Sequence, residues 1–109
     1  MKTIITIALS LFVASAISAR AADANQNWDN QCAQCHGKDG RGDTKMGQKL
    51  QAMDLTDAKK QAAFSDAQAA KAIKEGIKEG GKTKMKAFGD KLSDGEIKAL
   101  VAYVRALKK

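Results

Sequence analysis

The sequence predicts an all-α fold in one small domain, and three observations support this prediction. After residue 21 no segment alternates apolar and polar residues as a strand does, and β-branched residues are scarce. Apolar residues recur at helical spacing within residues 65–77 and 90–109. Residues 22–109 are enough for one domain only. We therefore expect three main helices packed around a single core.

Residues 1–21 have the pattern of a cleavable secretory signal peptide. Lys2 gives the positive start, an apolar run follows, and Ala19-Arg20-Ala21 fits a cleavage site, with cleavage after Ala19 as the close alternative. A retained membrane anchor is the other alternative, but the apolar run is short for a span, which needs about 20 apolar residues. We expect cleavage, a mature domain of residues 22–109 in the bacterial periplasm, and no membrane-spanning segment in that domain.

The first helix is expected to begin near Asp23 and to run into residues 32–36, whose sequence is CAQCH. This stretch contains both cysteines and the only histidine of the chain. Two cysteines three apart and followed directly by histidine are the attachment signature of a c-type haem. Cys32 and Cys35 would bond covalently to the porphyrin edge, and the His36 imidazole would bind the iron from one face.

Three other interpretations of this stretch are weaker. A structural zinc site usually has four protein ligands, whereas the chain contains three cysteine and histidine residues in total. A thioredoxin-like redox pair would need a preceding strand, which the sequence does not predict. A structural disulfide would close a loop too short to restrain the unfolded chain much. One covalently attached haem c is therefore the cofactor that we expect.

The mature chain has few large apolar residues, and alanine supplies much of its remaining apolar content. A core of that size is marginally stable without a cross-link or a bound group. A covalently bound and mostly apolar porphyrin would complete it. Trp28 precedes Cys32 by four residues, so we expect its ring on the haem side of the first helix, where it would also pack in the core.

Three glycines within residues 37–42 are expected to end the first helix and to let the backbone turn tightly past the haem. A phosphate-binding loop is the alternative, but no predicted strand precedes this stretch and no GKS or GKT ending follows it. Residues 44–63 are expected to form a loop with short helical turns.

The second helix is expected to begin at Ser65, which forms a capping box with Gln68. It should end at Gly76, with Gly80-Gly81 as a later alternative. The third helix is the clearest and lies within residues 90–109.

Ser93 and Glu96 are expected to form the capping box of the third helix, with Leu92 and Ile97 packed across its start. One apolar stripe follows along this helix, formed by Ile97, Leu100, Val101, Val104 and Leu107. A single stripe of this kind is a docking face, and the first helix is its expected partner.

The ligand on the second face of the iron cannot be another histidine of this chain, because His36 is the only one. The residues alone leave a methionine, a lysine, an exogenous ligand or an open position. Met46, Met53 and Met85 follow the haem motif, and each could equally be a core residue. Chain length does not choose among them, since even the segment from His36 to Met46 could span roughly 30 Å.

Across the whole mature chain the sequence resembles the class I monohaem c-type cytochromes of the cytochrome c family. The resemblance rests on the CxxCH motif near the mature N-terminus, the glycine-rich loop of residues 37–43, the MKAF segment of residues 85–88 and the C-terminal helix ending in residues 100–105. It implies a small cytochrome c-like fold of three main helices around one covalent haem. Class II cytochromes are four-helix bundles with the motif near the C-terminus, and they do not match.

In the resembled family the methionine of the Met-x-x-Phe segment is the second axial ligand, which implies this role for Met85. The chain departs from the family in two places. Lys86 stands where the family usually has proline. The loop after the haem motif lacks the family's Gly-Pro pair, whose proline carbonyl orients the histidine ring, and Met46-Gly47 stands roughly at that place.

The formal charge of +7 includes Lys2 and Arg20, so the mature chain carries +5 before haem is counted. Basic residues cluster in two segments that would form a basic rim if both bordered the haem edge. These residues are Lys82, Lys84 and Lys86 around Met85, and Lys38 and Arg41 after the haem motif. Such a rim suits an acidic docking site on a partner, with an ordinary solvated surface as the alternative. Nucleic acid is not an expected partner, because no aromatic stacking platform accompanies the lysines.

The function that we expect is electron transfer between periplasmic redox proteins by a monomer, not enzymatic catalysis. A histidine–methionine ligand pair, here His36 and Met85, tends to raise the potential of the haem. One alternative is a haem enzyme or a small-ligand-binding protein with an open or labile sixth site, although the chain offers no distal histidine for peroxide chemistry. The other alternative is a haem subunit of a periplasmic dehydrogenase or oxidase.

Overall fold

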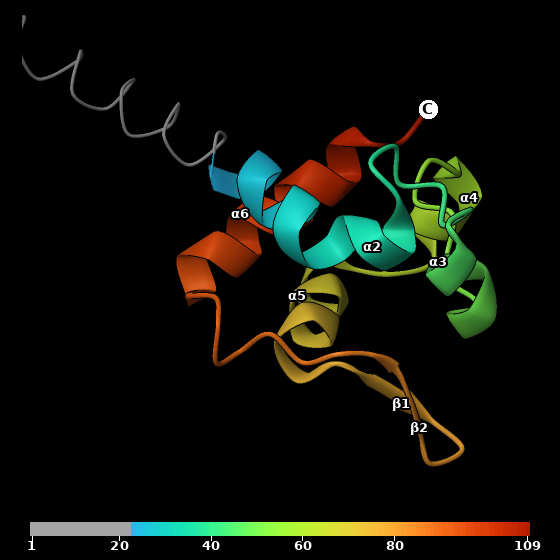
Figure 1. Cartoon of the computed structure of the whole chain (residues 1–109). Coiled ribbons are helices and arrows are strands. Elements are labelled where there is room, and N and C mark those ends of the chain that lie inside the picture. Colours follow the sequence, from blue (N-terminus) through green and yellow to red (C-terminus); the bar gives the residue numbers. More distant parts are fainter. Residues whose placement is uncertain (1–22) are drawn as a thin grey trace, which may run out of the picture.

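A computed structural model describes residues 23–109, and the predicted signal peptide of residues 1–21 lies outside the described residues. Three helical segments enclose the core: an N-terminal helix of residues 23–36, α5 (Asp66–Glu75) and α6 (Asp94–Ala106). Figure 1 shows α6 behind the N-terminal helix and α5 beneath both. The predicted all-α fold with three main helices is confirmed. No helix within residues 23–109 is long and apolar enough to cross a membrane.

The N-terminal helix changes its winding where it reaches the haem motif. Residues 23–27 lead into a π-helical turn, η1 (Trp28–Cys32), which continues as α2 (Ala33–His36). In this turn the Ala33 N–H donates to the carbonyl of Trp28, five residues earlier. Such turns are rare and are frequently found at functional sites. Here the wider turn lies where the chain presents Trp28 and Cys32, both buried, to the interior.

The apolar stripe of α6 packs against the N-terminal helix, as predicted. The rings of Trp28 and Tyr103 lie 5.2 Å apart, and the Tyr103 hydroxyl donates to the Asn25 side chain. The Asn27 amide donates to Glu96 at 3.1 Å near the start of α6. The two helices are therefore joined by an apolar contact with polar bonds at its edges. The buried core comprises Trp28, Cys32, Leu55, Ile73, Phe88, Leu92, Ile97, Leu100, Val101 and Val104.

Both predicted capping boxes are present. Ser65 Oγ accepts from the Gln68 N–H at 3.1 Å, and the Gln68 side chain accepts from the Ser65 N–H at 2.8 Å. Ser93 and Glu96 make the same pair of bonds at 3.1 and 3.0 Å. Each box satisfies two backbone donors that the first turn of a helix otherwise leaves free. These local bonds fix where α5 and α6 begin.

Residues 37–63 contain two short helices, α3 (Lys45–Leu50) and α4 (Ala58–Ala62), in agreement with the predicted short turns. Thr44 caps α3 through a bond from the Gly47 N–H to its hydroxyl oxygen, at 2.9 Å. Asp57 caps α4 through bonds from the N–H groups of its first turn. This segment therefore follows local signals, although it has few apolar residues of its own.

Gln61 joins α4 to α6 through a buried polar network. Its side chain is only 2% exposed, and its Nε2 donates to the carbonyls of Leu55 and Val104, each at 2.7 Å. Its Oε1 accepts from Arg105 at 3.0 Å. Arg105 also donates to the carbonyl of Phe64 at 2.7 Å, with its guanidinium over the Phe64 ring. The network closes the C-terminal end of the core.

A short β-hairpin follows α5 and was not expected from the sequence. Strands β1 (Ile77–Glu79) and β2 (Lys82–Met85) pair antiparallel, and Gly80 and Gly81 form the turn with positive φ. The strands are too short to show an alternating pattern, and both are mostly exposed. Figure 1 shows the hairpin projecting from the helical body.

Candidate functional site

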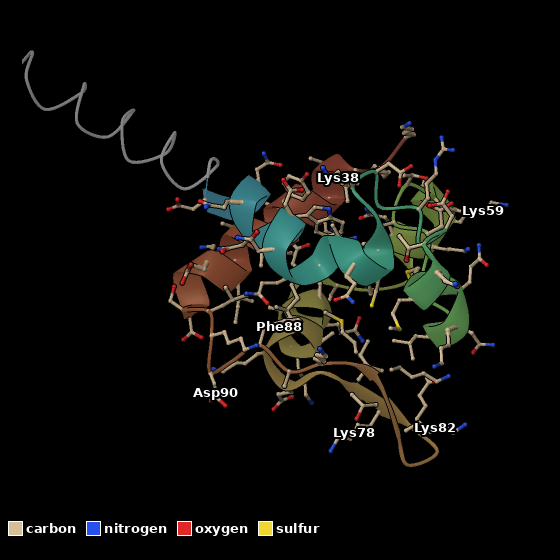
Figure 2. All side chains as sticks on the ribbon, viewed as in Figure 1. Lys38, Lys59, Lys78, Lys82, Phe88 and Asp90 are labelled. Carbon is tan, nitrogen blue, oxygen red and sulfur yellow. The ribbon has the colours of Figure 1, made fainter. Side chains whose placement is uncertain are left out.

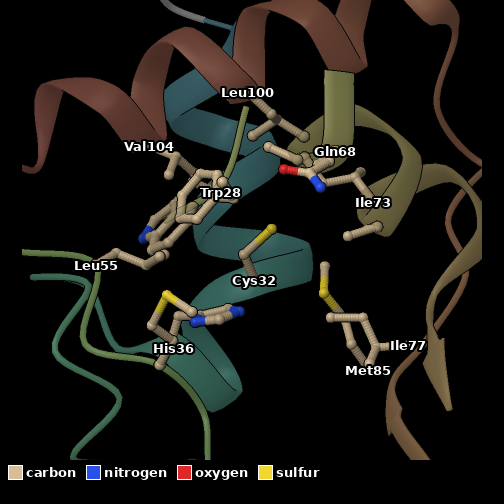
Figure 3. Close-up of a pocket in the computed structure, with 14 residues that line it drawn as sticks. Trp28, Cys32, His36, Leu55, Gln68, Ile73, Ile77, Met85, Leu100 and Val104 are labelled. Atoms are coloured by element: carbon tan, nitrogen blue, oxygen red, sulfur yellow. The ribbon is translucent and has the colours of Figure 1, made fainter. Parts of the chain in front are cut away.

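One pocket lies between the N-terminal helix, α5, α6 and the hairpin. Its cavity has a volume of about 230 Å³. Almost all of the side chains that line it are apolar, including the core residues Trp28, Leu100 and Val104 (Figure 3). Among the described residues that line it, none carries a carboxylate or an amine. The pocket is therefore suited to a large apolar group rather than to a charged substrate.

The His36 side chain points into this pocket from the end of α2 (Figure 3). Its ring lies 5.7 Å from the ring of Trp28, whose Nε1–H donates to the carbonyl of Gly37 at 3.1 Å. Burial lowers the pKa of His36, and the nearby Met53 backbone partly offsets this effect. Even so, no group meets full hydrogen-bond geometry with Nδ1, which is buried. The lowered pKa favours the neutral imidazole, which is the form that binds a metal.

The two cysteines differ in their surroundings. Cys32 is buried, lines the pocket beside His36, and burial, with a smaller effect of Cys35, raises the pKa of its thiol to about 11. Cys35 is half-buried and does not line the pocket. The backbone carbonyl of Cys35 accepts a bond from the Thr44 hydroxyl at 2.7 Å, which ties the motif to the following loop.

Met85 enters the pocket from the side opposite His36 (Figure 3). It is the last residue of β2 and pairs with Ile77 at the base of the hairpin. Gly76 allows the close approach of this segment, because a Cβ at Gly76, where φ is +77°, would lie 2.6 Å from the Met85 carbonyl oxygen. The end of α5 and the hairpin register therefore place the Met85 side chain in the pocket.

The other two methionines are placed differently. Met46 is 38% exposed and does not line the pocket. Met53 lines the pocket, but its backbone lies against the His36 imidazole, so it belongs to the same side as His36. Of the three candidates left open by the sequence, only Met85 faces His36 across the cavity.

The family model described as cytochrome c oxidase, cbb3-type, subunit III matches residues 19–104. The chain belongs to this family of monohaem c-type cytochromes. A search of curated proteins gave no match.

Two solved structures resemble this cytochrome closely. One, described as the KustC0563 c-type cytochrome, is 39% identical with a TM-score of 0.72, over 80% of this chain and 99% of the other. The second is a single-site mutant described under the name Kustc0563, which is 38% identical with a TM-score of 0.69, over 79% and 99% of the two chains. The resemblance to the cytochrome c family that the sequence indicated is thus confirmed.

Membership of this family means that the protein binds haem c covalently, and the residues around the pocket fit that group. The buried Cys32 thiol and the His36 imidazole lie side by side on the N-terminal helix. A haem that is bonded to the thiol and coordinated by the imidazole requires this arrangement. The remaining walls are apolar, as the porphyrin faces require. The cofactor expected from the sequence is therefore supported by independent features of the fold.

Sequence reasoning missed two participants in the pocket. Gln68 was assigned to the capping box of α5, yet it also lines the pocket. The backbone of Met53 contacts the His36 imidazole, and a backbone carbonyl leaves no signature in the residue type. Gln68 precedes the lining residue Ala72 by four residues on α5, and this spacing was the one available signal for the first of these.

The two basic segments predicted to form one rim do not adjoin. Lys38 lies at the opposite end of the molecule from Lys82 in Figure 2. Arg41 is paired with Asp39 at 3.8 Å, which partly neutralises the loop after the haem motif. The positive charge near Met85 is therefore carried by the hairpin and the residue after it, where Lys78 adds to Lys82, Lys84 and Lys86.

Proposed function

We propose that this cytochrome is an exported, monomeric carrier that transfers one electron between redox proteins of the periplasm. Cys32 and Cys35 would attach the haem covalently, and His36 and Met85 would be the two protein ligands of its iron. The observation that supports this most is the placement of His36 and Met85 on opposite sides of one apolar pocket (Figure 3).

The bound haem supplies a reversible one-electron couple at its iron. The protein contributes position and surroundings. The Cys32 thiol in the pocket and the neighbouring Cys35 thiol would hold the porphyrin edge against the N-terminal helix, while the buried Trp28 and Leu100 side chains would keep water from one wall. An apolar shell of this kind disfavours the additional positive charge of the oxidised iron and so raises its potential. A sulfur ligand from Met85 would also raise the potential.

An enzymatic role with an open sixth position has less support. Of the described side chains that line the pocket, none other than His36 is a candidate proton donor or acceptor of the kind used in peroxide chemistry. Gln68 offers a neutral amide only. A Met85 side chain in the pocket would also compete with small ligands for the iron.

A permanent haem subunit of an oxidase is the second candidate function. The family description names a subunit of a cbb3-type cytochrome c oxidase, and this supports the assembly of the present chain with larger redox proteins. The two functions use the same site and differ in whether the chain leaves its partner. Native separation of the periplasmic and membrane fractions distinguishes them, because a free carrier elutes alone and a subunit elutes with its complex.

The axial assignment is tested by Met85→Ala in the haem-loaded protein. We expect this variant to lose the weak near-red absorption band of a methionine–iron bond, to have a lower potential and to bind carbon monoxide in the reduced state. The covalent haem should remain. Absorption spectroscopy and redox titration measure these changes.

Met46→Ala is the matched control, because this methionine is exposed and lies outside the pocket. It should retain the band and exclude carbon monoxide. Met53→Ala should also retain the band. Loss of the band in Met53→Ala, or rapid carbon monoxide binding by the wild-type protein, would contradict the assignment and favour a labile or open site.

A further inference from the structure

Three aromatic side chains form a continuous line of contacts from the pocket to the protein surface. The ring centroids of His36 and Trp28 lie 5.7 Å apart, and those of Trp28 and Tyr103 lie 5.2 Å apart. Both distances are within the range of about 4.5–7 Å over which aromatic rings contact each other directly. His36 lines the pocket, Trp28 is buried, and Tyr103 is half-buried, so the line connects the interior with solvent.

Hydrogen bonds hold two of these rings in place. The Trp28 Nε1–H donates to the carbonyl of Gly37 at 3.1 Å, directly after His36 in the chain. The Tyr103 hydroxyl donates to the Asn25 side chain at 3.2 Å. Because each ring is fixed by a polar bond as well as by packing, the contacts along the line are specified by the fold.

The outer end of this line lies away from the hairpin that carries Met85. Tyr103 belongs to the C-terminal half of α6, which lies at the opposite end of the view from the hairpin in Figure 1. Its neighbours Ala102 and Ala106 are exposed and small. A docked protein can therefore approach the Tyr103 ring closely.

The surface around Tyr103 also differs from the hairpin in charge. Residues 23–36 include the exposed Asp23 and Asp29 but no lysine or arginine, whereas α3, α4, α5 and α6 each contain two basic residues. Burial raises the pKa of the Tyr103 hydroxyl, and the nearby Asp29 carboxylate adds to this effect. Lys98 is the only exposed basic residue of α6. We call Asp23, Asp29 and Tyr103 the acidic face.

We propose that His36, Trp28 and Tyr103 form a second electron route to the haem, which reaches the surface at the acidic face and serves a redox partner with a basic docking surface. The inference rests on the proposed role of His36 as an iron ligand. One electron passes from a donor to the ferric iron, which becomes ferrous, or from the ferrous iron to an acceptor. The rings only provide electronic coupling, because packed atoms transmit tunnelling better than a gap does. Neither ring is oxidised, and Tyr103 keeps its proton.

Intramolecular electron transfer tests the route in the haem-loaded protein. A ruthenium–bipyridine photosensitiser is attached to Ala106→His, an exposed site three residues after Tyr103 on the same side of α6. Flash excitation then reduces the ferric haem at a rate that absorption spectroscopy measures. Tyr103→Leu should slow this rate several-fold. Tyr103→Phe keeps the ring but not the bond to Asn25, and should match the parent protein.

The same label on Ala67→His is the matched control, because Ala67 is exposed on α5 and precedes the pocket residue Gln68. Tyr103→Leu should leave this second rate and the midpoint potential unchanged. An unchanged rate from the label at residue 106, or equal slowing from both labels, overturns the route. Trp28→Leu should slow only the rate from residue 106. If Trp28→Leu does not accumulate with haem, Tyr103→Leu decides.

Small charged oxidants test the acidic face. At low salt, Asp29→Asn should slow oxidation of the reduced protein by the tris(phenanthroline)cobalt(III) cation but not by the hexacyanoferrate(III) anion. Asp90→Asn is the control, since Asp90 is exposed outside the acidic face. Equal effects of the two substitutions overturn the assignment of a basic partner to this face.

The proposed axial role of His36 is checked separately by nuclear magnetic resonance of the unlabelled wild-type protein. If the His36 ring lacks the resonance shifts of a haem ligand, the proposed function fails and the route fails with it. If those shifts are present and Tyr103→Leu does not change the rate from residue 106, only the route is overturned.

Discussion

At the scale of single residues, the buried polar side chains of this small core bond mainly to backbone carbonyls. The Trp28 ring donates to Gly37, and Gln61 donates to Leu55 and Val104. Each bond joins two separate parts of the chain. It therefore fixes how those parts are placed relative to each other, as well as satisfying a buried donor.

Replacement of Gln61 tests the weight of this network. Gln61→Leu keeps a side chain of similar size but removes the donor to the Leu55 carbonyl and one of the bonds that the Arg105 guanidinium makes. We expect the free energy of unfolding to fall by about 1–3 kcal/mol, the usual cost of unsatisfied buried polar groups. Chemical denaturation of the haem-loaded protein measures this change.

Gln48→Leu is the control for Gln61→Leu, because the Gln48 amide is exposed and bonds to Asp43 at 3.3 Å. Its effect should stay within about 0.5 kcal/mol, as for most surface substitutions. Equal losses in the two variants would mean that the buried bonds of Gln61 add nothing to stability.

At the scale of elements, the two longer helices start where their capping boxes predict, and the hairpin between them holds Met85. Glu96 joins the start of α6 to the N-terminal helix, because it closes the capping box with Ser93 and also accepts a hydrogen bond from Asn27. The bond from the Ser93 N–H, with the bond from Asn27, lowers the pKa of the Glu96 carboxyl. One side chain thus starts α6 and ties it to its neighbour.

The lowered pKa of Glu96 predicts a pH dependence for stability. Because the carboxyl is more acidic when folded, its ionised form stabilises the protein above the ordinary glutamate pKa, and this contribution is lost as the pH falls through the folded value. Glu96→Gln removes the contribution. We expect the variant to have a lower melting temperature at neutral pH and a difference from the wild type that shrinks in acid.

Glu79→Gln is the matched control for the pH experiment, since Glu79 is exposed in β1 and its carboxylate makes no hydrogen bond within the described residues. It should melt with the wild type at every pH. A gap between Glu96→Gln and the wild type that stays constant as the pH falls would exclude the carboxylate charge as the cause.

The hairpin is the element whose charge should guide an acidic redox partner. Lys82→Glu with Lys84→Glu should slow the bimolecular electron transfer, most at low salt, because exposed charges are screened beyond about 8 Å at physiological ionic strength. Lys59→Glu with Lys60→Glu makes the same change in net charge on α4 and is the control. Stopped-flow measurements across a salt series give these rates. Equal rates for the two double variants would mean that the hairpin is not part of the docking surface.

At the scale of the whole molecule, the haem pocket and the hydrophobic core share their residues. Trp28, Leu100 and Val104 are buried in the core and line the pocket. A core of this size is marginally stable without a bound group or a cross-link, so the haem is expected to act as part of the core.

Removal of the haem should therefore abolish cooperative folding. Cys32→Ala with Cys35→Ala prevents covalent attachment, and we expect the purified chain to keep no pigment in acidified acetone and to show no sharp thermal transition by circular dichroism. The wild-type holoprotein, treated in the same way, should retain the pigment and melt cooperatively. A haem-free chain that melts as sharply and at the same temperature as the holoprotein would show that the pocket is stable when empty.

The features that the sequence determined by itself depend on residues close together in the chain. The start of α5 follows from Ser65 and Gln68, and the start of α6 from Ser93 and Glu96, because a capping box needs only residues three apart. The haem motif at residues 32–36 is equally local. These features, together with the apolar stripe of α6, were sufficient for the fold class, the family and the cofactor.

Other features were decided only by contacts between distant segments. Met85 faces His36 because the end of α5 and the hairpin register bring residue 85 to the pocket, whereas the sequence offered only the family resemblance of the Met-x-x-Phe segment to distinguish it from Met53. The strands of the hairpin are too short to show alternation, so their pairing was not visible in advance.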